Sequence, residues 1–282
     1  MAISRSQLVK ELEPGLNALF GLEYNRYDNE HAEIFASEAS DRAFEEEVML
    51  SGFGQAATKA EGAMVTFDQA TEAYTSRYTR ALARSMAQSK QITAANVLNN
   101  AFDTGGAYNG GDGKALCTTD HPLSNGGTFR NELSTAADLS ETSLEQALID
   151  IAGFVDERGL KIALQGRKLV IPKELQFTAE RIMKSPLSTT PGGSSAFAKN
   201  DINAMMNMGM IPEGYRVNHF LTDTDAFFIM TDAPNGMKHF VRSPIKTAIE
   251  GDFDTGNVRF KARERYSFGW SDPRGIFGSP GA

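Results

Sequence analysis

Residues 80–102, "RALARSMAQSKQITAANVLNNAF", contain neither glycine nor proline and are rich in alanine. Alanine has the highest helix propensity, whereas glycine and proline oppose helix formation, so this stretch predicts a helix of roughly six turns at ~3.6 residues each. Its bulky apolar residues are sparse and form no single clean stripe. A long helix with such a thin apolar face is typical of one that lies across a surface or contacts a neighbour.

The bulk composition describes a soluble chain that is large enough to bury a core. The sequence has 282 residues, of which 41% are hydrophobic and 23% charged, and this suits one or two domains. Its formal net charge of -8 disfavours a dedicated binder of free nucleic acid. The single cysteine excludes an intramolecular disulfide framework. No stretch approaches the ~20 apolar residues of a membrane span, and the first residues lack an apolar signal segment, so we expect no membrane crossing.

Nearly all of the net negative charge lies in residues 1–50. This stretch holds eleven Asp and Glu against four Lys and Arg, a difference of -7. Interleaved aromatic residues make it too hydrophobic for a disordered acidic tail. Pro14, Gly15 and Gly21 indicate that it does not form one long helix. We expect an extended arm that packs on something else, with a plain N-terminal subdomain as the alternative.

The middle of the chain alternates helix and strand signals. After a glycine-rich region of turns and short strands at 103–129, residues 142–158 predict a helix with a capping box at Thr142 and Glu145 and a stop at Gly159. A short buried strand at 168–172 then leads into another helix. This order predicts helices packed on a mixed sheet, the α+β class.

The last third of the chain favours strands. A long polar loop at 185–201 is followed by "YRVNHFLT", "AFFIMTD" and "KHFVRSP", all rich in β-branched and aromatic residues. In the last strand, 257–270, apolar residues alternate with cations, which predicts one buried face and one cationic face: Val258, Phe260 and Ala262 against Arg259, Lys261 and Arg263. Three interpretations of the cationic face are open: it contacts phosphate, it is exposed to solvent, or it forms ion pairs with acids such as those of the N-terminal arm.

Cys117, Asp120 and His121 are the parts of a nucleophilic site, but their spacing argues against one. A thiolate needs a base within hydrogen-bond reach, oriented by a third group. Adjacent residues of an extended chain point to opposite sides, and Pro122 biases His121 to that conformation. We therefore favour a polar turn in which Asp120 caps backbone amides, and an enzyme using Cys117 and His121 remains the minor alternative.

Other chemical motifs are weak. The glycine-rich stretch 105–115 fails the phosphate-loop pattern at two positions, and Asp103, Asn109 and Asp112 do not have EF-hand spacing, so a glycine-rich β-turn is preferred. The histidines show no metal-binding spacing, although a folded assembly of the four is left open: His31, His121, His219 and His239. We predict no catalytic, cofactor-binding or metal-binding residues and no cofactor. The acidic arm and the long helix with its thin apolar face cannot bury all of their apolar surface within one chain, which suggests assembly with copies of the chain.

Four stretches carry a family resemblance: "RALARSMAQSKQITAANVLNNAF", "HPLSNGGTFRN", "RKLVIPKELQFTAERIM" and "SFGWSDPRGIFGSPGA". In order and spacing they cover most of residues 80–282, and the last is the most specific. Together they resemble the major capsid proteins of tailed bacteriophages, which have the Hong Kong 97-like fold, and within these the Mu-type major head subunit group.

The resemblance implies an architecture of five segments. These are an N-terminal arm (1–48), an extended E-loop hairpin (49–79), a peripheral domain with a long spine helix (80–139), an axial domain with a mixed sheet and flanking helices (140–250), and a C-terminal return to the peripheral domain (251–282). The strand signal around Phe67 lacks a return strand before the spine helix, which predicts residues missing near Thr79. One family member crosslinks its subunits through an E-loop lysine, and Lys59 is the candidate here.

The resemblance also implies a structural function rather than an enzymatic one. Hexamers and pentamers would close into an icosahedral shell around double-stranded DNA, with the E-loop and the N-terminal arm over neighbouring subunits and the loop at 185–201 near a symmetry axis. The implied partners are copies of the chain, scaffold, portal and decoration proteins, and DNA contacted non-specifically, without a membrane. The implied location is the virion, assembled in the host bacterial cytoplasm. An encapsulin-type bacterial compartment is the alternative within the same fold.

Overall fold

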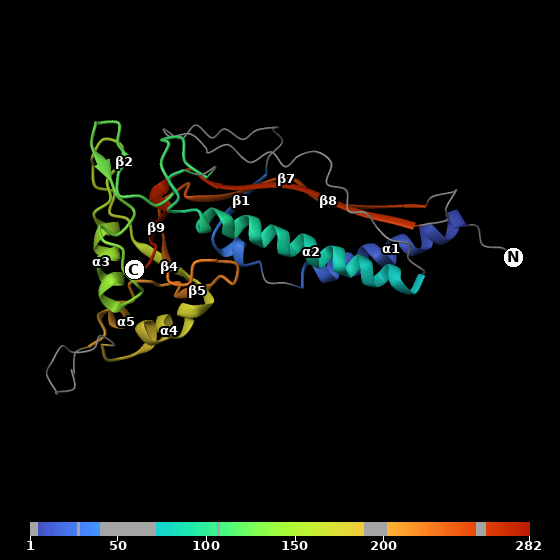
Figure 1. Ribbon diagram of the computed structural model, residues 1–282, viewed down its shortest axis with the longest axis horizontal. Helices are drawn as coiled ribbons and strands as arrows, with labels where there is room; N and C mark the ends of the chain where they lie inside the picture. Colours follow the sequence, from blue (N-terminus) through green and yellow to red (C-terminus); the bar gives the residue numbers. More distant parts are fainter. Residues whose placement is uncertain (1–4, 27–28, 40–71, 106–107, 189–201, 252–257) are drawn as a thin grey trace.

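The computed structural model describes residues 5–26, 29–39, 72–105, 108–188, 202–251 and 258–282. Residues 49–71 of the predicted E-loop hairpin, including Lys59, and most of the loop at 185–201 lie outside these residues. The chain is elongated, with a narrow extension at one end and a thicker body at the other (Figure 1). Helices and sheets occur in both parts, so the α+β class is confirmed.

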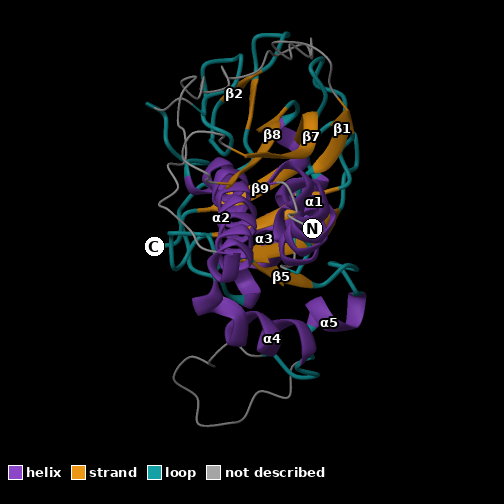
Figure 2. Cartoon of the chain, turned by 90° about the vertical axis from the view of Figure 1, so that its right-hand side faces the viewer, coloured by secondary structure: helices purple, strands orange, loops and turns teal. Residues whose placement is uncertain are grey.

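The extension consists of two helices against a long hairpin. Helix α2 (Glu72–Asn99) runs beside the antiparallel strands β7 (Met237–Gly251) and β8 (Val258–Trp270) (Figures 1 and 2). Helix α1 (Arg5–Tyr24) packs against α2 and against β7. After the short 3-10 helix η1 (Glu30–Glu33), β1 (Ala36–Ala39) pairs in parallel with β7 and completes a sheet of order β1-β7-β8.

The prediction that residues 1–50 contain no long helix is wrong. Helix α1 continues through Pro14 although proline removes a main-chain donor and costs about 3 kcal/mol inside a helix. Tertiary packing offsets this cost, because Leu16 and Phe20 are 4% and 2% exposed and share a cluster with Ala83 and Phe260. A full aromatic burial is worth about 1.5–3 kcal/mol, which is comparable to the proline penalty.

Helix α2 confirms the long helix predicted at 80–102, but its limits differ. It begins eight residues earlier, at Glu72, and ends at Asn99. It passes through Thr79 without interruption, so the prediction that residues are missing there is wrong. Small side chains such as Ala83 and Ala94 are buried, whereas Arg80 and Arg84 are exposed. The thin apolar face is thus a row of alanines that lets the helix approach the sheet closely.

The body is built on a mixed four-stranded sheet of order β5-β4-β6-β9, from β4 (Gly166–Ile171), β5 (Tyr215–Val217), β6 (Phe227–Thr231) and β9 (Ile276–Ser279). Strand β5 pairs in parallel with β4, and the other pairings are antiparallel. Helices α3 (Glu141–Ala152), α4 (Gln176–Lys184) and α5 (Ala204–Met208) supply much of the remaining core. The short elements are β2 (His121–Pro122), β3 (Thr128–Phe129), η2 (Lys173–Leu175) and η3 (Pro273–Gly275).

Strands β4, β6, β7 and β8 confirm the predicted strands, but the ends of α3 were predicted wrongly. Its N-cap is Ser140, whose side chain accepts from the amide of Ser143, and not Thr142. Its C-cap is Gly153, so the helix ends before Val155. Gly159 instead occupies a turn with φ +86°, a conformation that glycine adopts without strain.

Candidate assembly interface

Cys117 is a core residue rather than a nucleophile. Its side chain is 1% exposed and packs in a cluster with Ala101, Val170 and Phe228. Burial first, and the nearby carboxylate of Glu132 second, raise the pKa of the thiol well above its usual range. A thiol that stays protonated at neutral pH is a poor nucleophile.

His121 is equally committed to structure. Its ring is fully buried, with Nδ1 2.7 Å from Oδ2 of Asp112 and Nε2 3.3 Å from the carbonyl oxygen of Leu116. Both ring nitrogens therefore face oxygen acceptors, and neither presents a lone pair to a thiol. Burial opposes ionisation of Asp112, but hydrogen bonds from His121 and from the amide of Lys114 outweigh it and lower the pKa of this carboxyl.

The surrounding polar residues form turns, as predicted, with one difference. Asp103 accepts from the amide of Gly105 at 2.9 Å, and Asn109 donates to the carbonyl of Thr104 at 2.8 Å. Asp120 is exposed and points away from the buried His121, but it accepts from the hydroxyl of Thr118 and pairs with Lys114 instead of capping amides. The stretch from 114 to 131 thus combines polar turns with the short antiparallel pair β2–β3.

Two of the four histidines meet in the fold. The rings of His31 and His239 lie edge to face with centroids 5.3 Å apart, and His239 stacks on Phe268 at 4.3 Å. Burial lowers the pKa of both, that of His239 to about 3. Within the described parts of the chain, no three histidine, cysteine or acidic side chains converge as metal ligands.

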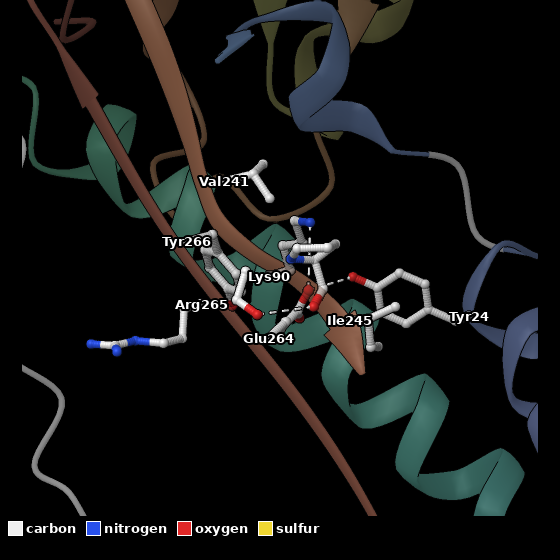
Figure 3. A pocket seen from close by; sticks show the side chains of 9 residues that line it. Tyr24, Lys90, Val241, Ile245, Glu264, Arg265 and Tyr266 are labelled. Carbon is white, nitrogen blue, oxygen red and sulfur yellow. Dashed lines mark hydrogen bonds and ion pairs between the residues drawn. The ribbon is translucent and has the colours of Figure 1, made fainter. Parts of the chain in front are cut away.

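A pocket of about 210 Å³ lies where α1, α2 and the β7–β8 hairpin meet (Figure 3). At its centre Glu264 accepts a 2.9 Å hydrogen bond from the hydroxyl of Tyr24 and lies 3.6 Å from Nζ of Lys90. Lys90 also lies over the ring of Tyr266, 5.1 Å from its centroid. Burial first, and Glu264 second, raise the pKa of Tyr24. Tyr24, Lys90 and Glu264 thus have one another as partners inside the chain, so they join three elements and offer no free catalytic pair.

Sequence reasoning missed this junction, although the sequence holds a signal for it. In the alternation of β8, Glu264 falls at an inward position, in step with Phe260 and Ala262. An acid on the buried face of a strand needs a partner, since an unpaired buried charge is costly. The side chains of Glu264 and Lys90 are indeed only 7% and 16% exposed.

Large apolar side chains are exposed around α4 and α5. Phe177 of α4 is 67% exposed and Met206 and Met208 of α5 are 45% and 68% exposed. Between these helices, Leu187 and Ile202 form a β-bridge and are 47% and 68% exposed. Soluble monomers rarely expose many large apolar groups on neighbouring elements, and such surfaces mark contacts with other molecules.

Comparisons with known proteins identify the family. A profile described as "Phage capsid protein" matches residues 54–278, most of the chain. The chain belongs to the phage capsid protein family. The family expected from the sequence is therefore confirmed, and membership points to a structural role. No curated protein sequence matches the chain.

Solved capsid proteins resemble this family member at low sequence identity. A virus-like particle from Pyrococcus furiosus has a TM-score of 0.50 and 10% identity over 94% of this chain and 97% of that one. A putative prophage capsid protein from E. coli CFT073 has a TM-score of 0.45 and 13% identity over 100% of both chains. A chain of Mycobacterium phage Che8 has a TM-score of 0.39 and 18% identity over 73% of this chain, which spans 63% of that one. These likenesses concern the fold.

The exposed surfaces, rather than an enclosed site, are where a capsid protein acts. Family membership supports self-association into a shell. None of the described helices is long and apolar enough to cross a membrane. The exposed apolar group on Phe177, Leu187, Ile202, Met206 and Met208, called the α4–α5 surface below, is the candidate interface.

Proposed function

We propose that the chain is the major capsid protein of a tailed phage, with a Hong Kong 97-like fold, and that it assembles as hexamers and pentamers into an icosahedral shell around double-stranded DNA. The α4–α5 surface carries this proposal, since it exposes five large apolar side chains that a subunit would bury against its neighbours. The net charge of -8 suits a container that does not bind its genome tightly.

The five-segment architecture belongs to this proposal. The five segments are proposed with the boundaries given above, except that α2, the proposed spine helix, begins at Glu72 and that β7 joins β8 in the extension. Helix α4 would lie in the axial domain. The α4–α5 surface would then face the local symmetry axis, next to the loop at 185–201. The proposed location is the virion shell, assembled in the host cytoplasm. Scaffold, portal and decoration proteins are the proposed further partners.

An encapsulin-type compartment is a second candidate. The fold similarity to a virus-like particle from Pyrococcus furiosus, at a TM-score of 0.50, supports a shell protein. It does not distinguish a shell that encloses a phage genome from a bacterial compartment. The enzyme that uses Cys117 and His121 is not proposed, because the thiol is buried and both imidazole nitrogens face acceptors.

Electron microscopy of the expressed chain tests the proposal. After gel filtration, negative-stain images should contain closed shells, tubes or capsomer rings. The double variant Met206→Asp/Met208→Asp should abolish these particles while circular dichroism stays unchanged, because both side chains are exposed. Leu22→Asp is the matched control, since Leu22 is 70% exposed on α1, away from this surface, and should leave assembly intact. Shells from the double variant would remove the α4–α5 surface as the interface.

A further inference from the structure

Three methionines with exposed side chains lie close together along the chain, in α5 and just beyond its C-terminal end. Met206 and Met208 are 45% and 68% exposed, and Met210, two residues after the helix, is 37% exposed. Helix α5 packs against α4 at one end of the body (Figure 2). The three thioethers therefore belong to the α4–α5 surface or lie at its border.

The backbone of this segment is fixed to the body, so the exposure of these side chains is part of the fold. Met205 and Ile211, at the two ends of the segment, are 2% and 4% exposed and belong to the body core. The amide group of Asn203 accepts from the backbone N–H of Met206 at 3.2 Å and donates to a carbonyl of α4. Gly209 ends the helix with φ +60°, in the left-handed conformation. The methionines between these anchors are held at the surface.

Methionine is the one residue type of the α4–α5 surface that peroxides oxidise readily; the other members are phenylalanine, leucine and isoleucine. A lone pair of the thioether sulfur forms an S–O bond while the O–O bond of the peroxide breaks. The sulfur is oxidised to a sulfoxide, and the peroxide is reduced and leaves as water or an alcohol after taking up a proton. The reaction converts a flexible apolar side chain into a polar one.

This change affects association rather than folding. On a free subunit the sulfoxides of exposed side chains stay hydrated, and buried methionines such as Met205 and Met237, 2% and 4% exposed, are shielded from the oxidant. In an interface each sulfoxide oxygen would lose water and meet apolar groups instead of a hydrogen-bond donor, which opposes burial. The folded subunit therefore survives an oxidation that its assembled form does not accommodate.

We propose that Met206, Met208 and Met210 form an oxidation site for peroxides, and that their conversion to sulfoxides reversibly blocks assembly through the α4–α5 surface. Methionine sulfoxide reductases reverse the change, one enzyme for each sulfoxide epimer: a dithiol becomes a disulfide, the thioether returns and water is released. The block of assembly rests on the proposed function, whereas the order in which the methionines are oxidised depends on the free subunit alone.

Peptide mapping after brief treatment of unassembled subunits with hydrogen peroxide tests the site itself. Trypsin releases residues 200–216 as one peptide that holds all four methionines of the region, so tandem mass spectrometry compares them within one molecule. The three exposed methionines should be oxidised faster than Met205 by about tenfold or more, and this difference should vanish in urea-unfolded subunits. Equal rates at Met205 and Met206 in folded subunits would overturn the proposal.

Assembly of the treated subunits tests the consequence. The measured quantity is the ratio of the subunit concentrations needed for shell assembly after and before peroxide, so a basal difference between variants cancels. This ratio should be about tenfold or more for the wild type and for the control Met205→Leu. It should stay near one for Met206→Leu/Met208→Leu/Met210→Leu, because leucine has a similar volume but no sulfur. Sulfoxide reductases should return the wild type toward one.

The outcomes separate the site from the shell function. Loss of assembly in the triple leucine variant would show that the damaging oxidation lies elsewhere, and the proposal would be wrong. Unchanged assembly of wild-type subunits whose three methionines are oxidised would also overturn it, while the shell function stands. If untreated wild-type subunits form no particles, the proposed function and the block of assembly both fall, and only the order of oxidation remains.

Discussion

Acidification should weaken the attachment of residues 29–39 to the hairpin, because folding keeps two histidines neutral. His239 is 3% exposed, stacks on Phe268 and contacts the hydroxyl of Ser37 through Nδ1 at 3.0 Å. Its Nε2 is buried without a partner among the described residues. Burial first, then Lys90 and His31, lower the pKa of His239 from 6.5 to about 3. His31 shifts in the same direction, again chiefly through burial.

The sign follows from proton uptake. Between pH 6.5 and about 3 the unfolded chain protonates His239 and the folded chain does not, so stability is full above pH 6.5 and falls as the pH drops toward 3. At pH 5, about 1.5 pH units below the unfolded value, this is worth about 2 kcal/mol at about 1.36 kcal/mol per unit. His31 adds to the loss.

The pH dependence of the unfolding free energy can be measured by urea denaturation of unassembled subunits from pH 7.5 to 4, followed through the fluorescence of Trp270. Carboxylates in ion pairs also weaken the fold in acid, so the decisive quantity is the difference between the wild type and His239→Gln. Glutamine retains a polar contact for Ser37 but does not titrate. Between pH 7 and pH 5 the unfolding free energy of the variant should therefore fall by about 2 kcal/mol less than that of the wild type. Parallel curves for the two proteins would show that the fold does not hold His239 neutral.

The remaining predictions concern packing and the buried pair. Lys90→Met should destabilise the subunit by about 3–5 kcal/mol, because Glu264 loses its cation in a buried position, and adding Glu264→Gln should recover part of this loss in the same urea titration. Leu144→Ala, at a fully buried position in α3, should cost about 2–5 kcal/mol by thermal or urea unfolding. Gly236→Ala should lower the yield of folded protein measured by gel filtration, because a Cβ there would lie 2.9 Å from the Cα of Gly275, a backbone atom that cannot move aside. Cys117→Ser should leave shell assembly intact in electron micrographs but cost about 1–3 kcal/mol of subunit stability, since it buries a hydroxyl among apolar groups.

Features that depend on local sequence were predictable. The alanine-rich composition of 80–102 identified α2, and the alternation in 257–270 identified β8 with Lys261 and Arg263 outward. Helix α1 was not, because Pro14 opposes it locally and the packing of Phe20 on Phe260 appears only when distant segments meet. The ends of α3 were also missed, since Ser140 and Thr142 are both acceptable caps and only the fold selects between them.

Some features of the candidate site were also predictable from local sequence, and others depend on contacts between distant segments. The spacing of Cys117 and His121 correctly argued against a nucleophilic pair. The contact between His31 and His239 joins residues from η1 and β7, and no spacing rule connects them. The α4–α5 surface was missed because exposed methionines and buried ones look alike in a sequence; Met205 is 2% exposed whereas its neighbour Met206 is 45% exposed.

The order of strands in the body sheet also governs when a subunit becomes complete during synthesis. Strand β9 pairs with β6 and contributes the fully buried Phe277, yet it follows both strands of the hairpin in the chain. Because a ribosome releases the N-terminal side first, the body waits for its edge strand until the whole extension has been made. A subunit interrupted before residue 276 therefore retains an open β6 edge and an unfilled core. A complete body thus shows that the hairpin has already been synthesised.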